Sequence, residues 1–373
     1  MAFAAALAWS LVLASALDAR RHARPLDGTA RPHDEPSVSV IVPARDEERG
    51  VGAAIRSLRA LEWERLELVI VDDESSDGTW AAIGAAAGAD PRVVAVRGSA
   101  PPPGWIGKQW ALHQGVQRST GAWLLFADAD VRHAPGSLAA ALARAEEEGA
   151  AAVSALPLIE TSGRGERVLT AAAILLVAAV IAPAALVRSA RVPVALAAGG
   201  HTLVRRDAYL AAGGHAAIRD RMVDDVALAE ALKAAGTPVA LAPSGGLVRV
   251  AMYGSLREAA RGWRKGAAHA VRGHAVGAAC GAAALGAAAV VPPLALAAGV
   301  RRRDARLAAW GAVGWSAQAA ARMAIRSFVP GPATEAVAAP AGLAAVAGLG
   351  LLSARDRRRT GAVWRGRAYP FAR

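Results

Sequence analysis

The sequence predicts an α/β protein with a mostly parallel sheet and with membrane helices at both ends of the chain. Three observations support this prediction. Between residues 37 and 127, short and nearly uninterrupted apolar strands alternate with helical segments, a pattern typical of a parallel sheet covered on both faces. Uncharged apolar segments occur near both termini, and some reach the length of a membrane span. The excess positive charge lies in the same terminal regions.

The formal net charge of +12 is concentrated at the two ends. Residues 1–24 carry three arginines against one aspartate, and residues 301–373 carry 13 arginines against three acidic side chains. Residues 25–300 balance to zero, with 27 basic and 27 acidic side chains. Membrane proteins concentrate positive charge beside their apolar segments, whereas nucleic-acid-binding domains carry it on the folded domain. We therefore expect a membrane partner and no nucleic acid. The single cysteine, Cys280, excludes a disulfide framework.

The N-terminal apolar segment favours a membrane anchor over residues 1–20. Residues 1–17 are uncharged, and Arg20, Arg21 and Arg24 follow them. A secretory signal carries its basic residues before the apolar run, so these arginines fit a cytoplasmic flank better. Ala14-Ser15-Ala16 could mimic a cleavage site, which leaves a cleaved signal as the alternative. Residues 21–36 are rich in proline and charge and are interpreted as a linker.

The next segment, 37–274, is predicted to be the catalytic domain. Its strands are expected at 37–42, 66–71, 92–96 and 122–127, with helices at 49–61, after Asp77 and at 107–118. Ligands of such sheets bind at the carboxyl ends of the strands. The polar stretches PARDEE, DDESSDGT and DAD follow three of the predicted strands at that edge, so we expect the site there.

Residues 275–373 are predicted to form a membrane region with a basic tail. Residues 275–300 and 336–354 are uncharged and of membrane length, and 307–321 is shorter. A re-entrant hairpin over 275–300, bent at Pro292-Pro293, would keep both the 301–303 arginines and the tail cytoplasmic. The apolar segment 168–187 is interpreted as an interfacial or core helix, because a span there would split one domain across the bilayer.

Asp128 and Asp130 suggest a divalent metal site. A single carboxylate after a strand is an ordinary helix cap. Two carboxylates at positions i and i+2 can hold Mg²⁺ or Mn²⁺ while phosphate oxygens and water complete the coordination.

Three motifs in order resemble the signature stretches of family 2 glycosyltransferases, which have the GT-A fold. They are VSVIVPARDEE, LVIVDDESSDGT and LLFADAD, and the resemblance runs from Ser37 to Gly266. Two further stretches, PPPGWIGKQWAL (101–112) and GGHAAIRDRMVDDVALAEALKAAG (213–236), resemble a membrane-bound subset. Hopene-associated and carotenoid glycosyltransferases typify that subset.

The resemblance implies a nucleotide-sugar donor and a role for each matching residue. Asp73 would contact the base with support from Asp72, and Asp128 and Asp130 would flank the diphosphate, Asp130 through a divalent metal. The metal would neutralise charge on the departing diphosphate. The loop beneath the nucleoside would contain Pro43, Ala44, Arg45 and Glu47.

The resemblance also implies a catalytic base. Asp225 matches the family's base, which takes the proton of the acceptor hydroxyl while that oxygen attacks and inverts the anomeric carbon. Asp224 stands where the family usually has glutamate. Both aspartates are equally compatible with a simple helix start before VALAEALKAAG.

Other candidates have two interpretations each. Lys108 could reach the diphosphate as a point charge or be a solvated lysine at a helix start. Gly200 and His201 match an acceptor loop, although His201 could be a turn residue. A third group forms either a lid over the diphosphate or a juxtamembrane anchor. That group is Arg261, Trp263, Arg264 and Lys265. It lacks the glutamine of the Gln-x-x-Arg-Trp motif found in related polysaccharide enzymes.

The function expected from this resemblance is inverting sugar transfer to the hydroxyl of a membrane lipid such as a hopanoid or carotenoid. The short membrane complement argues against a polysaccharide channel. Transfer to a polyprenyl phosphate is the alternative within the same class. A non-catalytic scaffold is disfavoured because Asp130 and Asp225 are both present.

Overall fold

The computed structural model describes the chain apart from residues 182, 190, 271–274, 357–361, 365–366 and 370–373 and some side chains next to them. The chain forms two compact units. The sheet unit contains Ala23–Ile159, Val187–Ala251 and Val363–Arg373. The helical unit contains Met1–His22, Glu160–Leu186 and Met252–Ala362.

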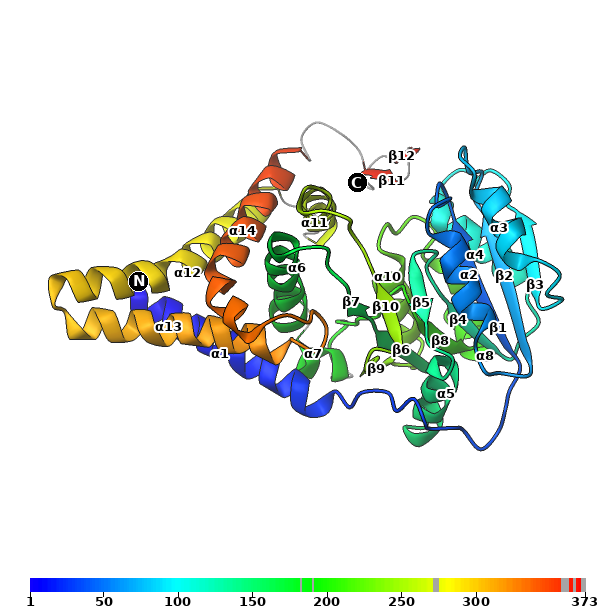
Figure 1. The fold of residues 1–373 in the computed structure, drawn as a ribbon, viewed down its shortest axis with the longest axis horizontal. Helices are drawn as coiled ribbons and strands as arrows, with labels where there is room; N and C mark the ends of the chain where they lie inside the picture. Colours follow the sequence, from blue (N-terminus) through cyan, green and yellow to red (C-terminus); the bar gives the residue numbers. More distant parts are fainter. Residues whose placement is uncertain (182, 190, 271–274, 357–361, 365–366, 370–373) are drawn as a thin grey trace. The chain divides into compact units, whose positions relative to one another are not determined.

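A seven-stranded sheet forms the centre of the sheet unit (Figure 1), in the order β3-β2-β1-β4-β8-β6-β9. The strands are β1 (Val38–Ala44), β2 (Leu66–Asp72), β3 (Val93–Arg97), β4 (Trp123–Phe126), β6 (Ala152–Leu156), β8 (Thr202–Arg205) and β9 (Ala240–Pro243). All described pairings are parallel except those of β8, which runs against both neighbours. The predicted mostly parallel sheet is confirmed.

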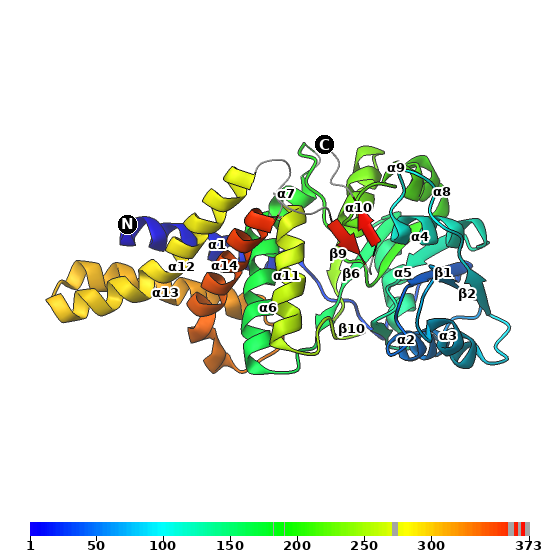
Figure 2. The ribbon, with the colours of Figure 1, turned by 90° about the horizontal axis from the view of Figure 1, so that it is seen from above.

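Helices cover this sheet, and the elements predicted between residues 37 and 127 are all present close to their expected bounds. The helices are α2 (Val51–Arg59), α3 (Thr79–Ala87), α4 (Gly107–Gln117), α5 (Ser137–Glu147), α8 (Arg206–Ala211), α9 (Gly214–Ala217) and α10 (Asp224–Ala234) (Figure 2). Val40, Ile41 and Val42 of β1 are fully buried, which explains why the strands lack the alternation of a one-sided sheet. A small second sheet pairs β5 (Val131–His133), β10 (Val248–Val250) and β7 (Leu158–Ile159).

The helical unit gathers the apolar segments. Its helices are α1 (Ala2–His22), α6 (Arg164–Leu176), the π-helix η1 (Val177–Ile181), α11 (Leu256–Ala270), α12 (Ala275–Arg302), α13 (Ala305–Ala324), the 3₁₀ helix η2 (Ala333–Ala338) and α14 (Ala339–Asp356). The short α7 (Ala184–Arg188) spans the boundary between the units. Three helical segments of the described chain are long and apolar enough to cross a membrane: Ala2–His22, Val276–Arg302 and Ala333–Arg355.

The compact units divide the chain differently from the expected boundary at residue 274. Glu160–Leu186 and the chain from Met252 onward belong to the helical unit. The apolar segment that begins near residue 168 finds its partners there, because α6 packs on α11 and α14 and η1 packs on α1. It is therefore not a core helix of the sheet unit.

The expected hairpin over residues 275–300 is wrong, because α12 continues as one helix through Pro292 and Pro293. Each proline lacks the N–H that would bond the carbonyl four residues earlier. The structure replaces both donors. Gln318 Nε2 of α13 donates to the carbonyls of Ala288 and Ala289 at 3.2 and 3.1 Å, and Trp9 Nε1 of α1 donates to Ala288 at 2.8 Å. Because these carbonyls accept side-chain hydrogen bonds, the helix remains continuous across the two prolines.

Arg20 and Arg21 lie at the C-terminal end of α1, whereas Arg301 and Arg302 lie near its N-terminal end. Phe3 packs edge-on against Trp310 with 4.7 Å between ring centroids, so α1 and α13 begin side by side. Arg301 and Arg302 end α12 just before α13 begins, whereas Arg20 and Arg21 lie in the last turn of α1.

Candidate active site

The polar stretches after β1 and β2 meet at the carboxyl edge of the sheet. Ala44 pairs with Asp72 in register, so both strands end level. The N–H of Asp73 donates to the carbonyl of Ala44 at 2.8 Å. The guanidinium of Arg45 donates to the carbonyls of Asp73 and Glu74. Ala44 and Arg45 of the expected nucleoside loop thus lie beside Asp73 and Glu74. Pro43 pairs with Val71 in β2, and the N–H of Glu47 donates to Thr79 Oγ1 at 2.7 Å.

Asp72 and Asp73 are both buried, but they have different partners. Asp72 accepts the N–H of Ser75 at 3.3 Å and so shapes the following turn. Both carboxylate oxygens of Asp73 accept hydrogen bonds from Arg367 of the C-terminal segment, each at 2.9 Å. Burial raises the pKa of Asp73 above its ordinary value, although Arg367 and Arg45 oppose the rise. The contact with Arg367 was not expected from the sequence.

A second cluster joins α4, the end of β4 and the start of α10. The ammonium of Lys108 lies 2.7 Å from Asp128 Oδ1 and 2.9 Å from Asp224 Oδ2. Burial lowers the pKa of Lys108, but the two carboxylates more than offset this and hold it well above its ordinary value. Lys108 is therefore charged and bridges two acids, rather than being a solvated lysine.

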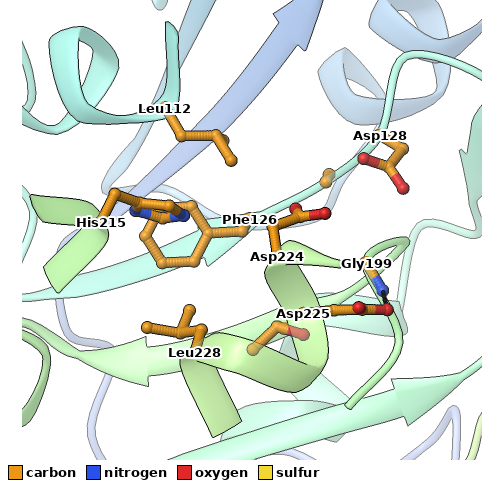
Figure 3. A pocket seen from close by; sticks show the side chains of 10 residues that line it. Leu112, Phe126, Asp128, Gly199, His215, Asp224, Asp225 and Leu228 are labelled. Carbon is orange, nitrogen blue, oxygen red and sulfur yellow. Dashed lines mark hydrogen bonds between the residues drawn. The ribbon is translucent and has the colours of Figure 1, made fainter. Parts of the chain in front are cut away.

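Asp225 follows Asp224 at the start of α10. Its Oδ2 accepts the N–H of Gly199 at 3.0 Å (Figure 3). Its Oδ1 accepts the N–H of Val226 at 2.8 Å. Burial and the charge of Asp224 raise the pKa of Asp225 to about 7, against the opposing effect of Lys108. A carboxyl group with a pKa near neutrality suits general base catalysis at neutral pH.

Asp128, Asp224 and Asp225 face one pocket (Figure 3), which also has an apolar side. The remaining lining residues are Leu112, Phe126, Ala127, Gly199, Thr202, His215 and Leu228. His215 was not singled out from the sequence, although it lies in the stretch 213–236. Its Nδ1 lies 2.7 Å from the hydroxyl of Tyr209, and burial lowers its pKa to about 3. It is therefore a neutral wall of the pocket.

Gly199 lines the pocket, whereas His201 does not. A Cβ on Gly199 would lie 2.8 Å from Asp128 Oδ2, so a larger residue there would require the carboxylate or the loop to shift. His201 is fully buried, and its ring packs on His133 with 5.2 Å between centroids. His201 therefore does not form the wall of this pocket, contrary to one of the two interpretations of the sequence. Gly200 packs against Val131 instead of lining the pocket.

Asp128 and Asp130 are the residues that could hold a divalent metal. Both are half-buried and flank Ala129 directly after β4. In the part of the chain that the structure describes, no group of three or more histidine, cysteine or acidic side chains converges on one point. Mg²⁺ commonly uses one or two carboxylates together with substrate phosphates. Asp128 and Asp130 supply two carboxylates, which fits a metal that takes its remaining ligands from a diphosphate and water.

The expected lid residues belong to the helical unit. They lie on α11, where Trp263 Nε1 donates to Thr170 Oγ1 of α6 at 3.3 Å and the Trp263 ring packs on Tyr253. Trp263 thereby fastens α11 to α6. Arg261 is exposed and Arg264 half-buried. The side chain of Lys265 lies outside the described residues.

Comparison with known proteins agrees with this geometry. Residues 39–211 match the model of glycosyl transferase family 2. The chain is 33% identical over 134 residues to a 4,4'-diaponeurosporenoate glycosyltransferase of Staphylococcus haemolyticus, a match that covers 35% of each protein. It therefore spans about a third of that relative's length.

A solved structure resembles nearly the whole chain. It is the mannosyltransferase PcManGT from Pyrobaculum calidifontis in complex with GDP-Man and Mn²⁺. The similarity covers 94% of this chain and 99% of that chain at a TM-score of 0.55 and 20% identity, which shows a shared fold. Residues 39–211 are thus similar to a glycosyltransferase domain of family 2, and the protein shares the GT-A fold of the solved glycosyltransferase structure.

Proposed function

We propose that this protein transfers a sugar from a nucleoside-diphosphate sugar to the hydroxyl of a membrane lipid, with inversion at the anomeric carbon. One observation carries the proposal. Asp225, whose pKa is raised to about 7, is fixed by two backbone N–H groups in the same pocket as Asp128. Asp225 is thus a positioned base beside the carboxyl edge of the sheet, where a diphosphate could bind near Asp128.

Asp225 acts as the general base in this proposal. Its deprotonated carboxylate accepts the proton of the acceptor hydroxyl while that oxygen bonds to the anomeric carbon and the diphosphate leaves. Gly199 and Val226 orient the carboxylate by donating one backbone N–H to each oxygen. Asp224 supports the site by holding Lys108, whose charge keeps Asp225 from becoming a still weaker acid.

The donor would bind along the carboxyl edge of β1, β2 and β4. Asp73 and its neighbouring loop would recognise the nucleoside, and Lys108 would provide positive charge for the diphosphate. Asp128 and Asp130 would hold Mg²⁺ or Mn²⁺, which when bound neutralises charge on the leaving group. The complex of PcManGT with GDP-Man and Mn²⁺ supports this assignment.

A neutral lipid hydroxyl suits the pocket better than an anionic acceptor. Leu112, Phe126 and Leu228 give the pocket an apolar lining beside Asp225. Asp128 and Asp224 contact the ammonium of Lys108, and Asp225 lines the same pocket as these two acids, so a polyprenyl phosphate would meet net negative charge. The name of the staphylococcal relative points to a carotenoid-type acid as its acceptor. A hopanoid or a similar lipid has the same apolar character.

The protein is proposed to be a multi-pass protein of the cytoplasmic membrane with its sheet unit in the cytoplasm. The helical unit has three segments of spanning length. Arg20 and Arg21 end α1 directly before the sheet unit begins at Ala23, in agreement with the positive-inside rule. Arg261, Trp263 and Arg264 would then lie near the membrane surface as a lid or an anchor.

Mass spectrometry of total lipids tests this function. Cells that express the protein should contain a glycosylated lipid that is missing from cells without it and from cells with the Asp225→Asn variant. Cells with an Asp220→Asn variant, which changes an exposed aspartate, should retain it. Identical lipid profiles in all four strains would contradict the proposal.

A further inference from the structure

We propose that the C-terminal segment competes with the donor's nucleobase for Asp73 through Arg367, so that the chain gates its own donor site. This inference rests on the proposed function, because it assigns a regulator to the same nucleotide site.

The contact joins residues that are 294 positions apart in the sequence. Arg367 begins β12 (Arg367–Tyr369), which pairs with β11 (Ala362–Trp364). One nitrogen of its guanidinium, Nη1, donates to both oxygens of Asp73 at 2.9 Å, and Nη2 contacts the carboxylate of Glu74. Arg45 Nη1 lies 4.0 Å from Asp73 Oδ2.

Asp73 has no surface left for a base while Arg367 is in place. The exposed fraction of its side chain is 0%. A nucleobase would have to donate a neutral N–H to one of these oxygens, and such a bond is weaker than the charge-assisted bond that the oxygens already accept from arginine. Base recognition by Asp73 therefore requires Arg367 to leave first.

Two features of the C-terminal segment favour release of Arg367 from Asp73. The side chain of Arg367 retains 19% exposure, whereas that of Asp73 has none, so water reaches the ion pair from the arginine end. β11 and β12 form a two-stranded sheet of their own, separate from the seven-stranded sheet, and an isolated pair of strands is only marginally stable. In the described residues, the closed state is held by the ion pairs of Arg367 with Asp73 and Glu74.

Competition lowers the apparent donor affinity in proportion to the open fraction. If the tail occupies Asp73 for nine-tenths of the time, freeing the site should tighten nucleotide binding ~10-fold. Removing a positive charge would by itself weaken the binding of an anionic nucleotide. Tighter binding after the loss of an arginine is therefore a specific sign of competition.

The test is calorimetric titration of the full-length protein with UDP and with GDP, each with Mn²⁺. Arg367→Ala should bind the preferred nucleotide several-fold to ~10-fold more tightly than the unaltered protein. Arg355→Ala removes an equal charge from an exposed position at the end of α14, and it should bind no more tightly than the unaltered protein. Asp73→Asn should weaken binding and cancel the effect of Arg367→Ala when the two are combined.

Equal or weaker binding by Arg367→Ala would overturn the gate. If the glycosylated lipid is still made in that case, only the gate fails and the proposed function stands. If neither nucleotide binds any variant and the lipid product is also missing, the proposed function fails together with the gate.

Discussion

At the scale of single residues, burial and Lys108 shift the pKa of Asp225 in opposite directions. Burial and the neighbouring Asp224 raise its pKa to about 7, while Lys108 opposes this rise. The base is thus balanced near neutrality, where it can accept a proton and also be regenerated.

Activity should depend on pH through Asp225. Only the deprotonated carboxylate accepts a proton, so kcat/KM should be low at acidic pH, rise through about pH 7 and then level off.

The free energy of unfolding should follow the opposite trend with pH. Because the folded pKa is raised from 3.8 to about 7, the folded state binds more protons between these values and loses stability as the pH rises. Asp225→Asn should therefore gain thermal stability over the unaltered protein at pH 8 more than at pH 5, as measured by thermal denaturation.

Lys108→Met should move the pH–activity profile to higher pH. The variant removes the one charge that lowers the pKa of Asp225 and leaves the carboxylates of Asp128 and Asp224 without their bridging ammonium. Lys108→Arg keeps the charge and should shift the profile much less. An unchanged midpoint in Lys108→Met would show that another group limits the rate.

Gly199→Ala should impair transfer without unfolding the protein. The added Cβ would lie 2.8 Å from Asp128 Oδ2, so either the carboxylate or the loop that donates to Asp225 must move. A kinetic titration with Mn²⁺ should show a lower kcat. Gly149→Ala has open space around its Cβ, although its positive φ adds strain, and it should leave kcat unchanged. A Gly199→Ala enzyme with normal kcat would contradict the close approach.

At the scale of elements, local sequence predicted the sheet but not the partners that arrive from afar. The strands β1 to β4 were predictable because runs such as Val38–Ala44 are apolar on both faces. The continuity of α12 was not, because Gln318 and Trp9 supply the missing donors from 30 and 279 positions away. The contact of Arg367 with Asp73 was not predictable either, because the two residues are 294 positions apart. The only signal in the sequence for His215 was its place in the stretch 213–236, which resembles the membrane-bound subset.

Gln318→Leu tests the account of α12. The substitution keeps the volume but leaves the carbonyls of Ala288 and Ala289 without this donor. A buried polar group without a partner costs about 1–3 kcal/mol, so the helical unit should unfold at a lower temperature in detergent. Gln117→Leu changes an exposed glutamine of α4 and should leave the melting temperature nearly unchanged. Equal melting of both variants would mean that α12 does not need these bonds.

At the scale of the whole molecule, the contact of Arg367 with Asp73 constrains the topology. The sheet unit ends at Ala251 and resumes at Val363. If both parts lie on the same side of the membrane, the chain between them crosses an even number of times. Two of the candidate spans, Val276–Arg302 and Ala333–Arg355, lie in that interval. The tail should therefore be cytoplasmic together with the sheet unit.

Thiol labelling checks this sidedness. A Thr360→Cys variant in a Cys280→Ala background should react with an impermeant reagent only after cells are permeabilised. Labelling of the introduced thiol in intact cells would place the tail outside and contradict the shared side of tail and sheet unit.

The central claim is that Asp225 is the base of a sugar transfer, and single-turnover transfer from the preferred nucleotide sugar to extracted membrane lipid tests it most directly. Asp225→Asn keeps the shape of the side chain and removes its basicity, so the rate should fall by ~10²–10⁴ while nucleotide binding persists. The Asp220→Asn control should react at the normal rate. A normal rate for Asp225→Asn, or a loss confined to nucleotide binding, would contradict the assignment.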